Sequence, residues 1–260
     1  RPASPQYRRS AFSYSIIDGS ADTDRQPVFE EENAVAVITI FRQAGCKGRY
    51  IAENVARTLD YHFADYATAE RLMLQCGFQQ TPQVYDSVSE CWDRFTRRGM
   101  ERDQINAMLR SIVLATAQHG DVVLLGRGCF APLQGLCDVL NVRVKAPLPL
   151  RIERVMEEHD LTKQQATRFV EEKDALVADF ARTSYGLSPD DLTLFDLVID
   201  TGKVDPDAAV RWLVEAAGNL QCRPGDPTAA ALKVAQVPKR AVAKEFTRRE
   251  RLRAEKRARS

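Results

Sequence analysis

The chain alternates between short apolar runs and longer amphipathic segments from residue 34 to about residue 217. Runs that are apolar throughout are typical of parallel strands covered on both faces. The predicted strands are residues 35–41, 61–65, 121–126, 139–144 and 195–200. Between them, apolar positions at helical spacing predict helices. The predicted helices are residues 48–59, 67–76, 86–97, 101–118, 148–158, 162–182 and 205–217. This alternation predicts an α/β domain with a doubly wound parallel sheet of about five strands.

The segments on either side of this region lack its periodicity. Residues 1–33 contain several Pro, Ser and Asp residues and no regular apolar pattern, which predicts an extended N-terminal arm. The motif Arg-Pro-Gly-Asp-Pro at 223–227 interrupts the chain after the last predicted helix of the domain. We therefore divide the chain into an arm (1–33), a domain (34–217), and a linker with a basic helical tail (218–260).

The tail concentrates the positive charge of a chain whose formal net charge is only +1. Residues 238–260 hold ten Lys or Arg against three Glu, so the remaining residues are acidic on balance. Glu residues interleaved with Arg at helical spacing predict a solvated helix. A basic tail on an acidic body favours an anionic or protein partner, such as RNA, for residues 238–260, with the arm 1–33 as a second contact. A solubilising tail is the alternative.

Six cysteines are scattered along the chain, and the three histidines are isolated. Without a CxxC pair or metal-ligand spacing, they predict reduced thiols and no metal site. This composition is typical of an intracellular, reducing compartment, either the cytoplasm or an organellar matrix. The start at Arg1 is compatible with removal of an organellar leader. No apolar run approaches the roughly 20 residues that cross a bilayer, so no membrane span is expected.

The first predicted strand leads through a glycine loop into a helix, with the sequence RQAGCKGRY at 42–50. Gly45 and Gly48 would let the backbone wrap a phosphate, and Lys47 or Arg49 would supply positive charge. The strict signature GxxxxGK[ST] is absent, because Arg49 and Tyr50 stand where Lys and Ser/Thr would be. The alternative is a plain strand-to-helix turn whose glycines allow tight geometry.

Two further segments carry candidate chemistry. Arg127, in Gly-Arg-Gly, follows the predicted strand 121–126, where α/β proteins bind ligands, and could grip a phosphate. Residues 148–185 form a charged helical pair that could act as a mobile lid bringing arginines onto transferred phosphates. The alternatives are a surface turn and a solvated helical hairpin. The charged residues that the lid would use are Arg151, Arg154, Arg168, Asp174 and Arg182.

In their order and spacing, these motifs resemble the cytidylate kinase-like family, P-loop proteins related to nucleoside monophosphate kinases. The resemblance covers about residues 35–217. The family's loop reads approximately SREYGSGGREIA, and this chain has FRQAGCKGRYIA. Tyr61–Asp65, Gly126-Arg127, and Asp174 and Arg182 of the helical pair also match. The resemblance implies a P-loop NTPase-like fold with a helical lid.

The resemblance also implies an activity and roles for individual residues. The activity would be ATP- and Mg²⁺-dependent phosphoryl transfer to a (d)CMP-like acceptor. Asp65 and Arg127 would bind the acceptor. Arg182 would stabilise the transition-state charge, and Arg49 would act both in catalysis and in ATP binding. The residues that would hold ATP are Arg42, Gly45, Lys47, Gly48 and Arg49.

Two departures from the family pattern support a second hypothesis. Tyr50 replaces the family's Glu and stands where ordinary phosphate loops have the Ser or Thr that binds the metal, and Val177 stands where the family has a basic lid residue. The alternative is a catalytically degenerate kinase-like subunit with a nucleotide-binding or structural role in a larger assembly.

Overall fold

The computed structural model describes residues 36–77, 102–126 and 128–259. The predicted arm (1–33), the predicted helix at 86–97 and Arg127 lie outside the described residues, so those predictions stand as they are.

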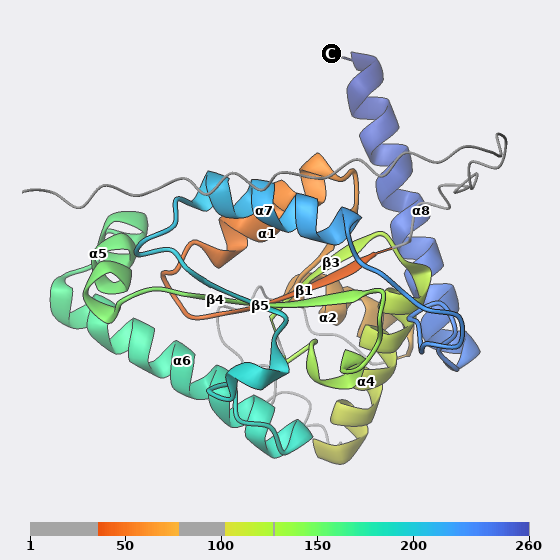
Figure 1. Ribbon diagram of the computed structural model, residues 1–260, viewed down its shortest axis with the longest axis horizontal. Coiled ribbons are helices and arrows are strands. Elements are labelled where there is room, and N and C mark those ends of the chain that lie inside the picture. The colour runs from red at the N-terminus through yellow and green to blue at the C-terminus, as the bar shows by residue number, and fades with distance from the viewer. Residues whose placement is uncertain (1–35, 78–101, 127, 260) are drawn as a thin grey trace, which may run out of the picture. The chain divides into compact units, whose positions relative to one another are not determined.

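The described residues contain one sheet of five parallel strands in the order β2-β3-β1-β4-β5 (Figure 1). The bounds are β1 Val37–Arg42, β2 His62–Ala64, β3 Val122–Leu125, β4 Val139–Lys145 and β5 Leu197–Asp200. The central strand β1 pairs with β3 and β4, and Ile38 lies opposite Val123 and Leu140. The carboxyl ends of all five strands therefore meet at one edge. The prediction of a doubly wound parallel sheet is confirmed.

Helices cover both faces of the sheet (Figure 1). Their bounds are α1 Gly48–Thr58, α2 Tyr66–Gln75, α4 Arg102–His119, α5 Leu148–His159, α6 Lys163–Tyr185, α7 Pro206–Gly218 and α8 Gln236–Arg259. Because side chains alternate along a strand, each face has its own core. Ile38 packs with Val55 of α1 and Leu213 of α7. On the other face, Val37 packs with Ile112 of α4.

The C-terminal helix α8 corrects the sequence-based expectation of a solvated helix. One short face, Ala241, Val242, Glu245 and Phe246, is buried against α4, α2 and β2. The Phe246 ring stacks on His62 with centroids 3.9 Å apart. This face continues back to Pro238, which is also buried, and its few apolar residues do not stand out among the charges of the tail. Residues 33–260 form one compact unit that includes α8.

Helix α8 also covers the outer edge of β2, which pairs with β3 alone among the described strands. Arg249 Nη1 donates to the carbonyl of Phe63 (2.5 Å), and Arg253 Nη2 donates to that of Tyr61 (3.2 Å). Four helical residues rise about 6 Å, close to the roughly 6.6 Å between alternate strand carbonyls. The two arginines therefore occupy acceptors that would otherwise be open to another strand.

Glu245 is the buried charge of this helix, with 1% of its side chain exposed. Burial by itself would raise the pKa of Glu245, but the hydrogen bonds and charges of Arg248, Arg249 and Arg71 outweigh it and lower that pKa to about 2.

This shift predicts a loss of stability in acid. The unfolded chain takes up a proton on Glu245 near pH 4.5, whereas the folded chain resists it until about pH 2. The free energy of unfolding should therefore fall as the pH drops from 4.5 towards 2. We expect a loss of about 2 kcal/mol. Solvent screening keeps the loss below the full effect of the pKa shift, because two of the three arginines are solvent-exposed. Urea titrations across this pH range measure the free energy of unfolding of the wild type and of Glu245→Gln. If this free energy fell equally with pH in both proteins, the lowered pKa of Glu245 would be contradicted.

The structure also corrects the expectation that all the cysteines are free thiols. Cys137, just before β4, and Cys222, after α7, form a disulfide with Cα atoms 5.3 Å apart. The backbone N–H of Cys137 also donates to the carbonyl of Pro227. The two residues are 85 positions apart in sequence. The fold alone brings them together, and their spacing contains no sign of it.

Cys222→Ser should lower the free energy of unfolding by about 2–4 kcal/mol, since a disulfide that closes a long loop restricts the unfolded chain. Chemical unfolding measured with and without a thiol reductant tests this. Reductant should destabilise the wild type and leave Cys222→Ser unchanged. Equal stability of the two proteins without reductant would show that the bond contributes nothing in solution.

Among the described helices, none combines the length and the apolar character that crossing a bilayer requires.

Candidate functional site

The glycine loop between β1 and α1 lies at the carboxyl edge of the sheet. Gly45 has a φ of 73°, and a Cβ on it would lie 2.5 Å from the carbonyl oxygen of Arg151. A Cβ on Gly48 would lie 2.7 Å from Cβ of Arg42. Both positions therefore require glycine, because the loop packs tightly on α5 and α1 packs tightly on the end of β1.

The base of the loop is fixed by two helices that the sequence suggested as a lid. Arg151 Nη1 donates to the carbonyl of Ala44 (3.1 Å) and to Asp174 Oδ2 (2.6 Å). Asp174 Oδ1 in turn accepts the N–H of Ala44 (2.8 Å). The Arg151 side chain is only 7% exposed, so this ion pair is largely buried. Arg151 and Asp174 thus position the loop from α5 and α6.

Arg42, the last residue of β1, projects its guanidinium between the loop and the end of β3. Its Nη1 would be 3.7 Å from a Cβ placed on Gly126. Burial lowers the pKa of Arg42, although such a group stays charged at neutral pH. Among the described residues, no carboxylate or carbonyl pairs with it at hydrogen-bond or ion-pair distance. A desolvated cation without a partner is a strong site for an anion.

The N-terminus of α1 is open on the same side. Its N-cap, Lys47, has a φ of 61° and makes no side-chain cap bond. By contrast, Asp65 caps α2, Thr162 caps α6 and Asp205 caps α7. The first-turn N–H groups of a helix have no intrahelical acceptor, so those of α1 are available to an anion. The Lys47 side chain is exposed beside them.

Arg49 and Asp65, predicted on the ATP side and the acceptor side, contact each other. Arg49 Nη2 lies 2.5 Å from Asp65 Oδ2, and its Nη1 lies 2.6 Å from Glu53 Oε1. Burial would raise the pKa of Asp65, but hydrogen bonds from Arg49 and Thr68 lower it below its usual range. Asp65 is therefore a firmly ionised carboxylate at the junction of the two predicted subsites.

A pocket opens at the carboxyl ends of β2 and β3. Asp65 and Thr68 line one side, Gly126 lies at the end of β3, and α2 and α4 supply apolar side chains. The apolar lining consists of Ala64, Ala69, Leu72, Ile112, Val113, Leu124, Leu125 and Cys129. A site of this kind suits a flat organic ring with a few polar anchors. Since Arg42 Nη1 lies close to Gly126, the loop and the pocket adjoin each other.

Two residues of the predicted lid, Arg182 and Val177, lie in different surroundings on α6. Arg182 is exposed on α6, and its Nε donates to the carbonyl of Ala178 in its own helix (3.3 Å). No hydrogen bond or ion pair joins it to the loop within the described residues, so its catalytic role stays a prediction. Val177 packs against the aromatic cluster of Phe41, Phe130 and Phe195. An apolar residue therefore fits position 177 for packing reasons.

Tyr50, at the position of the usual metal-binding hydroxyl, is directed to α7. Its hydroxyl donates to Asp207 Oδ1 (2.6 Å), and this bond, together with the carboxylate charge, raises the pKa of Tyr50. Cys46 lies beneath the loop, where burial raises the pKa of its thiol and Sγ donates to the carbonyl of Val144. It is a neutral packing group and not a nucleophile.

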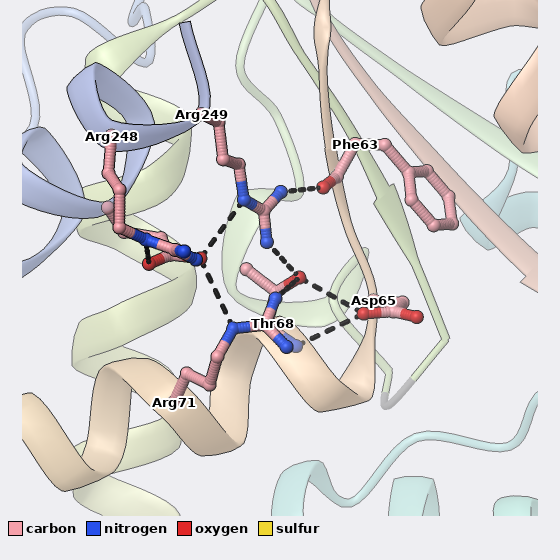
Figure 2. Close-up of polar contacts among 7 residues, drawn as sticks. Phe63, Asp65, Thr68, Arg71, Arg248 and Arg249 are labelled. Carbon is pink, nitrogen blue, oxygen red and sulfur yellow. Dashed lines mark hydrogen bonds and ion pairs between the residues drawn. The ribbon is translucent and has the colours of Figure 1, made fainter. Parts of the chain in front are cut away.

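Sequence reasoning missed three residues that shape this site. Thr201, after β5, donates from Oγ1 to the carbonyl of Cys46 in the loop (2.9 Å). Thr68 of α2 donates to Asp65, and Arg249 of α8 donates to Thr68 (Figure 2). The Asp-x-x-Thr spacing of Asp65 and Thr68 is a recognisable helix-cap signal. The other two come from distant segments and carry no local signal.

Comparison with known proteins shows which family and which proteins this chain resembles. The model of the cytidylate kinase-like family matches residues 37–203. The chain belongs to the cytidylate kinase-like family. A cytidylate kinase of Pyrobaculum aerophilum is 34% identical over 177 residues, which is 68% of this chain and 90% of that protein. A cytidylate kinase of Methanocaldococcus jannaschii is 30% identical over 129 residues, 49% of this chain and 72% of that protein.

A solved structure supports the same fold for this family member. The crystal structure of an uncharacterized protein from Eubacterium ventriosum matches with a TM-score of 0.56 at 15% identity, and the match covers 71% of this chain and 99% of that one. The predicted P-loop class of α/β fold is confirmed. The matched family region ends at residue 203, so α8 lies beyond it.

Proposed function

We propose that the protein transfers the γ-phosphoryl group of ATP to a nucleoside monophosphate of the (d)CMP type. The observation that carries the proposal is the guanidinium of Arg42, which has no partner in the part of the chain that the structure describes and lies between the glycine loop and the pocket at β2 and β3. A cation in that place adjoins both predicted phosphate positions at once. Stabilising charge on a transferred phosphoryl group is the main task of a phosphotransferase site.

On the donor side, the open N-terminus of α1 supports binding of the ATP phosphates. Backbone N–H groups of the first turn would donate hydrogen bonds to the phosphate oxygens, with the Lys47 side chain beside them. Arg49 would exchange part of its contact with Glu53 and Asp65 for a phosphate oxygen. The clamp of Arg151 and Asp174 would keep the loop preorganised, so that little reorganisation accompanies binding.

On the acceptor side, the pocket and Asp65 support a cytosine nucleotide. The apolar walls suit the face of a base, and the ionised Asp65 at the rim accepts hydrogen bonds only. The exocyclic amino group of cytosine is a donor, whereas uracil and thymine have a carbonyl there. Arg127, from the same strand end, is proposed to bind the acceptor phosphate.

Mg²⁺, when bound, would supply positive charge that neutralises part of the negative charge of the phosphates. The described residues near the loop supply it with few direct ligands, because Tyr50 is bonded to Asp207 and Asp174 to Arg151. Phosphate oxygens and water are the ligands that remain. In-line transfer would then depend on how the substrates are positioned and on the positive charge around the transferred phosphoryl group. Arg42 and Arg49 would supply this charge, and Arg182 is proposed to approach from α6.

The bond between Tyr50 and Asp207 favours a second candidate function, a kinase-like subunit that binds nucleotide without turnover. It removes the one hydroxyl that the loop could offer to a metal. In that case the basic tail or the arm 1–33 would serve an RNA or protein partner. Within the described tail, Arg248, Arg249, Arg253 and Arg257 already contact groups of this chain, which limits the charge that an outside partner could use.

A binding and turnover experiment separates the two functions. Isothermal titration with ATP·Mg²⁺ and with CMP, followed by an assay coupled to ADP release, should show binding of both and production of ADP only when both are present. UMP and AMP serve as acceptor controls. Binding without ADP production would support the second function, and absence of binding at millimolar concentrations would reject both.

A further inference from the structure

We propose that Arg249 of α8 is a positioning residue for the acceptor site, acting through Thr68 to fix the carboxylate of Asp65. The proposal rests on the proposed function and extends it to a helix beyond the matched family region. Figure 2 shows Arg249 reaching from α8 to the carbonyl of Phe63 and to Thr68, with Asp65 on the far side of Thr68.

The hydroxyl of Thr68 has one proton and two lone pairs. Arg249 Nη2 donates to this oxygen (2.7 Å), and so does Arg71 Nη2 (3.2 Å). Because both arginines can only donate, they occupy the two lone pairs. The proton of the hydroxyl is thereby directed to Asp65 Oδ1, which lies 3.0 Å away.

Fixing this proton fixes the orientation of the carboxylate. Asp65 Oδ1 accepts both the hydroxyl and the N–H of Thr68 (3.1 Å), so Oδ2 is turned towards Arg49 and the loop. Thr68 is buried, and Arg249 is only 18% exposed. The Thr68 hydroxyl and its bond from Arg249 are therefore largely shielded from water, and hydrogen bonds to charged groups are stronger in such surroundings than in water.

Arg249 is itself held in place from two directions. Its Nε donates to Glu245 Oε1 (3.0 Å), whose side chain is buried, and its Nη1 donates to the carbonyl of Phe63 at the end of β2. All three nitrogens of its guanidinium therefore donate hydrogen bonds, and these bonds connect α8 to the wall of the pocket. We infer that docking of α8 sets how firmly the acceptor side of the site is preorganised.

Arg253 provides a matched control. It lies one turn further along α8 and also caps a carbonyl of the β2 edge, that of Tyr61, and it pairs with the exposed Asp60. It contacts neither Thr68 nor Asp65 in the described structure. Arg249→Gln and Arg253→Gln therefore both remove a hydrogen bond to a carbonyl at the β2 edge. Of the two, only Arg249→Gln also removes the hydrogen bond to Thr68.

The test is steady-state kinetics of the full chain with CMP and ATP. Arg249→Gln should raise the KM for CMP about tenfold and leave the KM for ATP within about twofold, whereas Arg253→Gln should change neither. In a Thr68→Val background, which lacks the hydroxyl, Arg249→Gln should have no further effect. An equal rise in both KM values, the same effect from Arg253→Gln, or an undiminished effect in Thr68→Val would overturn the proposal.

A second measurement keeps this proposal separate from the proposed function. The amide of Thr68 donates to Asp65, so its NMR signal reports the position of the carboxylate in the nucleotide-free protein. Arg249→Gln should shift that signal and Arg253→Gln should leave it in place. If the wild type does not use CMP, the proposed function fails, and this signal still decides whether Arg249 positions Asp65. An unmoved signal in Arg249→Gln rejects the positioning role.

Discussion

Arg42→Gln is expected to lower kcat/KM for phosphoryl transfer by about 100- to 1000-fold, the range observed when a preorganised charge is removed from a transition-state site. Glutamine keeps much of the length of the side chain and loses its charge. The guanidinium is partly buried and lacks a partner among the described residues, so its charge is available to the substrate phosphates. The measurement is the coupled ADP assay with CMP, together with titration of ATP.

The control for this variant is Arg57→Gln. Arg57 lies in the last turn of α1, is exposed, and contacts Asn54 of the same helix. Its replacement should leave kcat/KM unchanged within about twofold, since exposed charges interact weakly. Wild-type activity in Arg42→Gln, with normal stability, would show that Arg42 does not stabilise the transferred group.

Arg151→Met should lower the free energy of unfolding by about 3 kcal/mol, because it removes one partner of a largely buried ion pair. Asp174 would lose its cation, and the carbonyls of Ala44 and Ala146 would lose a donor. Since these contacts fix the base of the glycine loop, ATP affinity should fall as well. Chemical unfolding and ATP titration of the same variant measure the two effects.

Arg168→Met is the matched control for the clamp. Arg168 of α6 also pairs with a carboxylate, that of Glu172 at 2.6 Å, but its side chain is 81% exposed. Exposed helical pairs contribute only about 0.5 kcal/mol. Similar losses of stability from Arg151→Met and Arg168→Met would refute the idea that burial makes the Arg151 pair important.

The sequence predicted the strands and helices well, because each carries a local signal. Strands β1 and β3 lie in apolar runs long enough to recognise, and Asp205-Pro206 marks the start of α7 at the residue where the structure begins it. The glycine loop was predicted for the same reason. The alternative, that its glycines allow tight geometry, is supported by the close approach of the Arg151 backbone to Gly45 and of the Arg42 side chain to Gly48, and their role in phosphate binding stays a prediction.

The errors concern features that depend on contacts between distant segments. Cys137 and Cys222 have no spacing signal, and the fold alone brings them together. The tail was expected to be solvated because its charges are regular, yet the small buried face around Phe246 fits the site left by α4 and β2. One role of the helical pair also depends on such contacts: Arg151 anchors the loop, and the catalytic role of Arg182 stays a prediction.

By itself, the sequence determined the α/β class, the parallel sheet and the loop at the end of β1, since hydrophobic periodicity and glycine placement act over a few residues. Only the tertiary structure decided which charges are partnered. It left Arg42 without a partner among the described residues, paired Arg49 with Asp65, and brought Arg249 from α8 to Thr68. Electrostatic roles depend on distance and burial in space, and those quantities are set by packing across the whole chain.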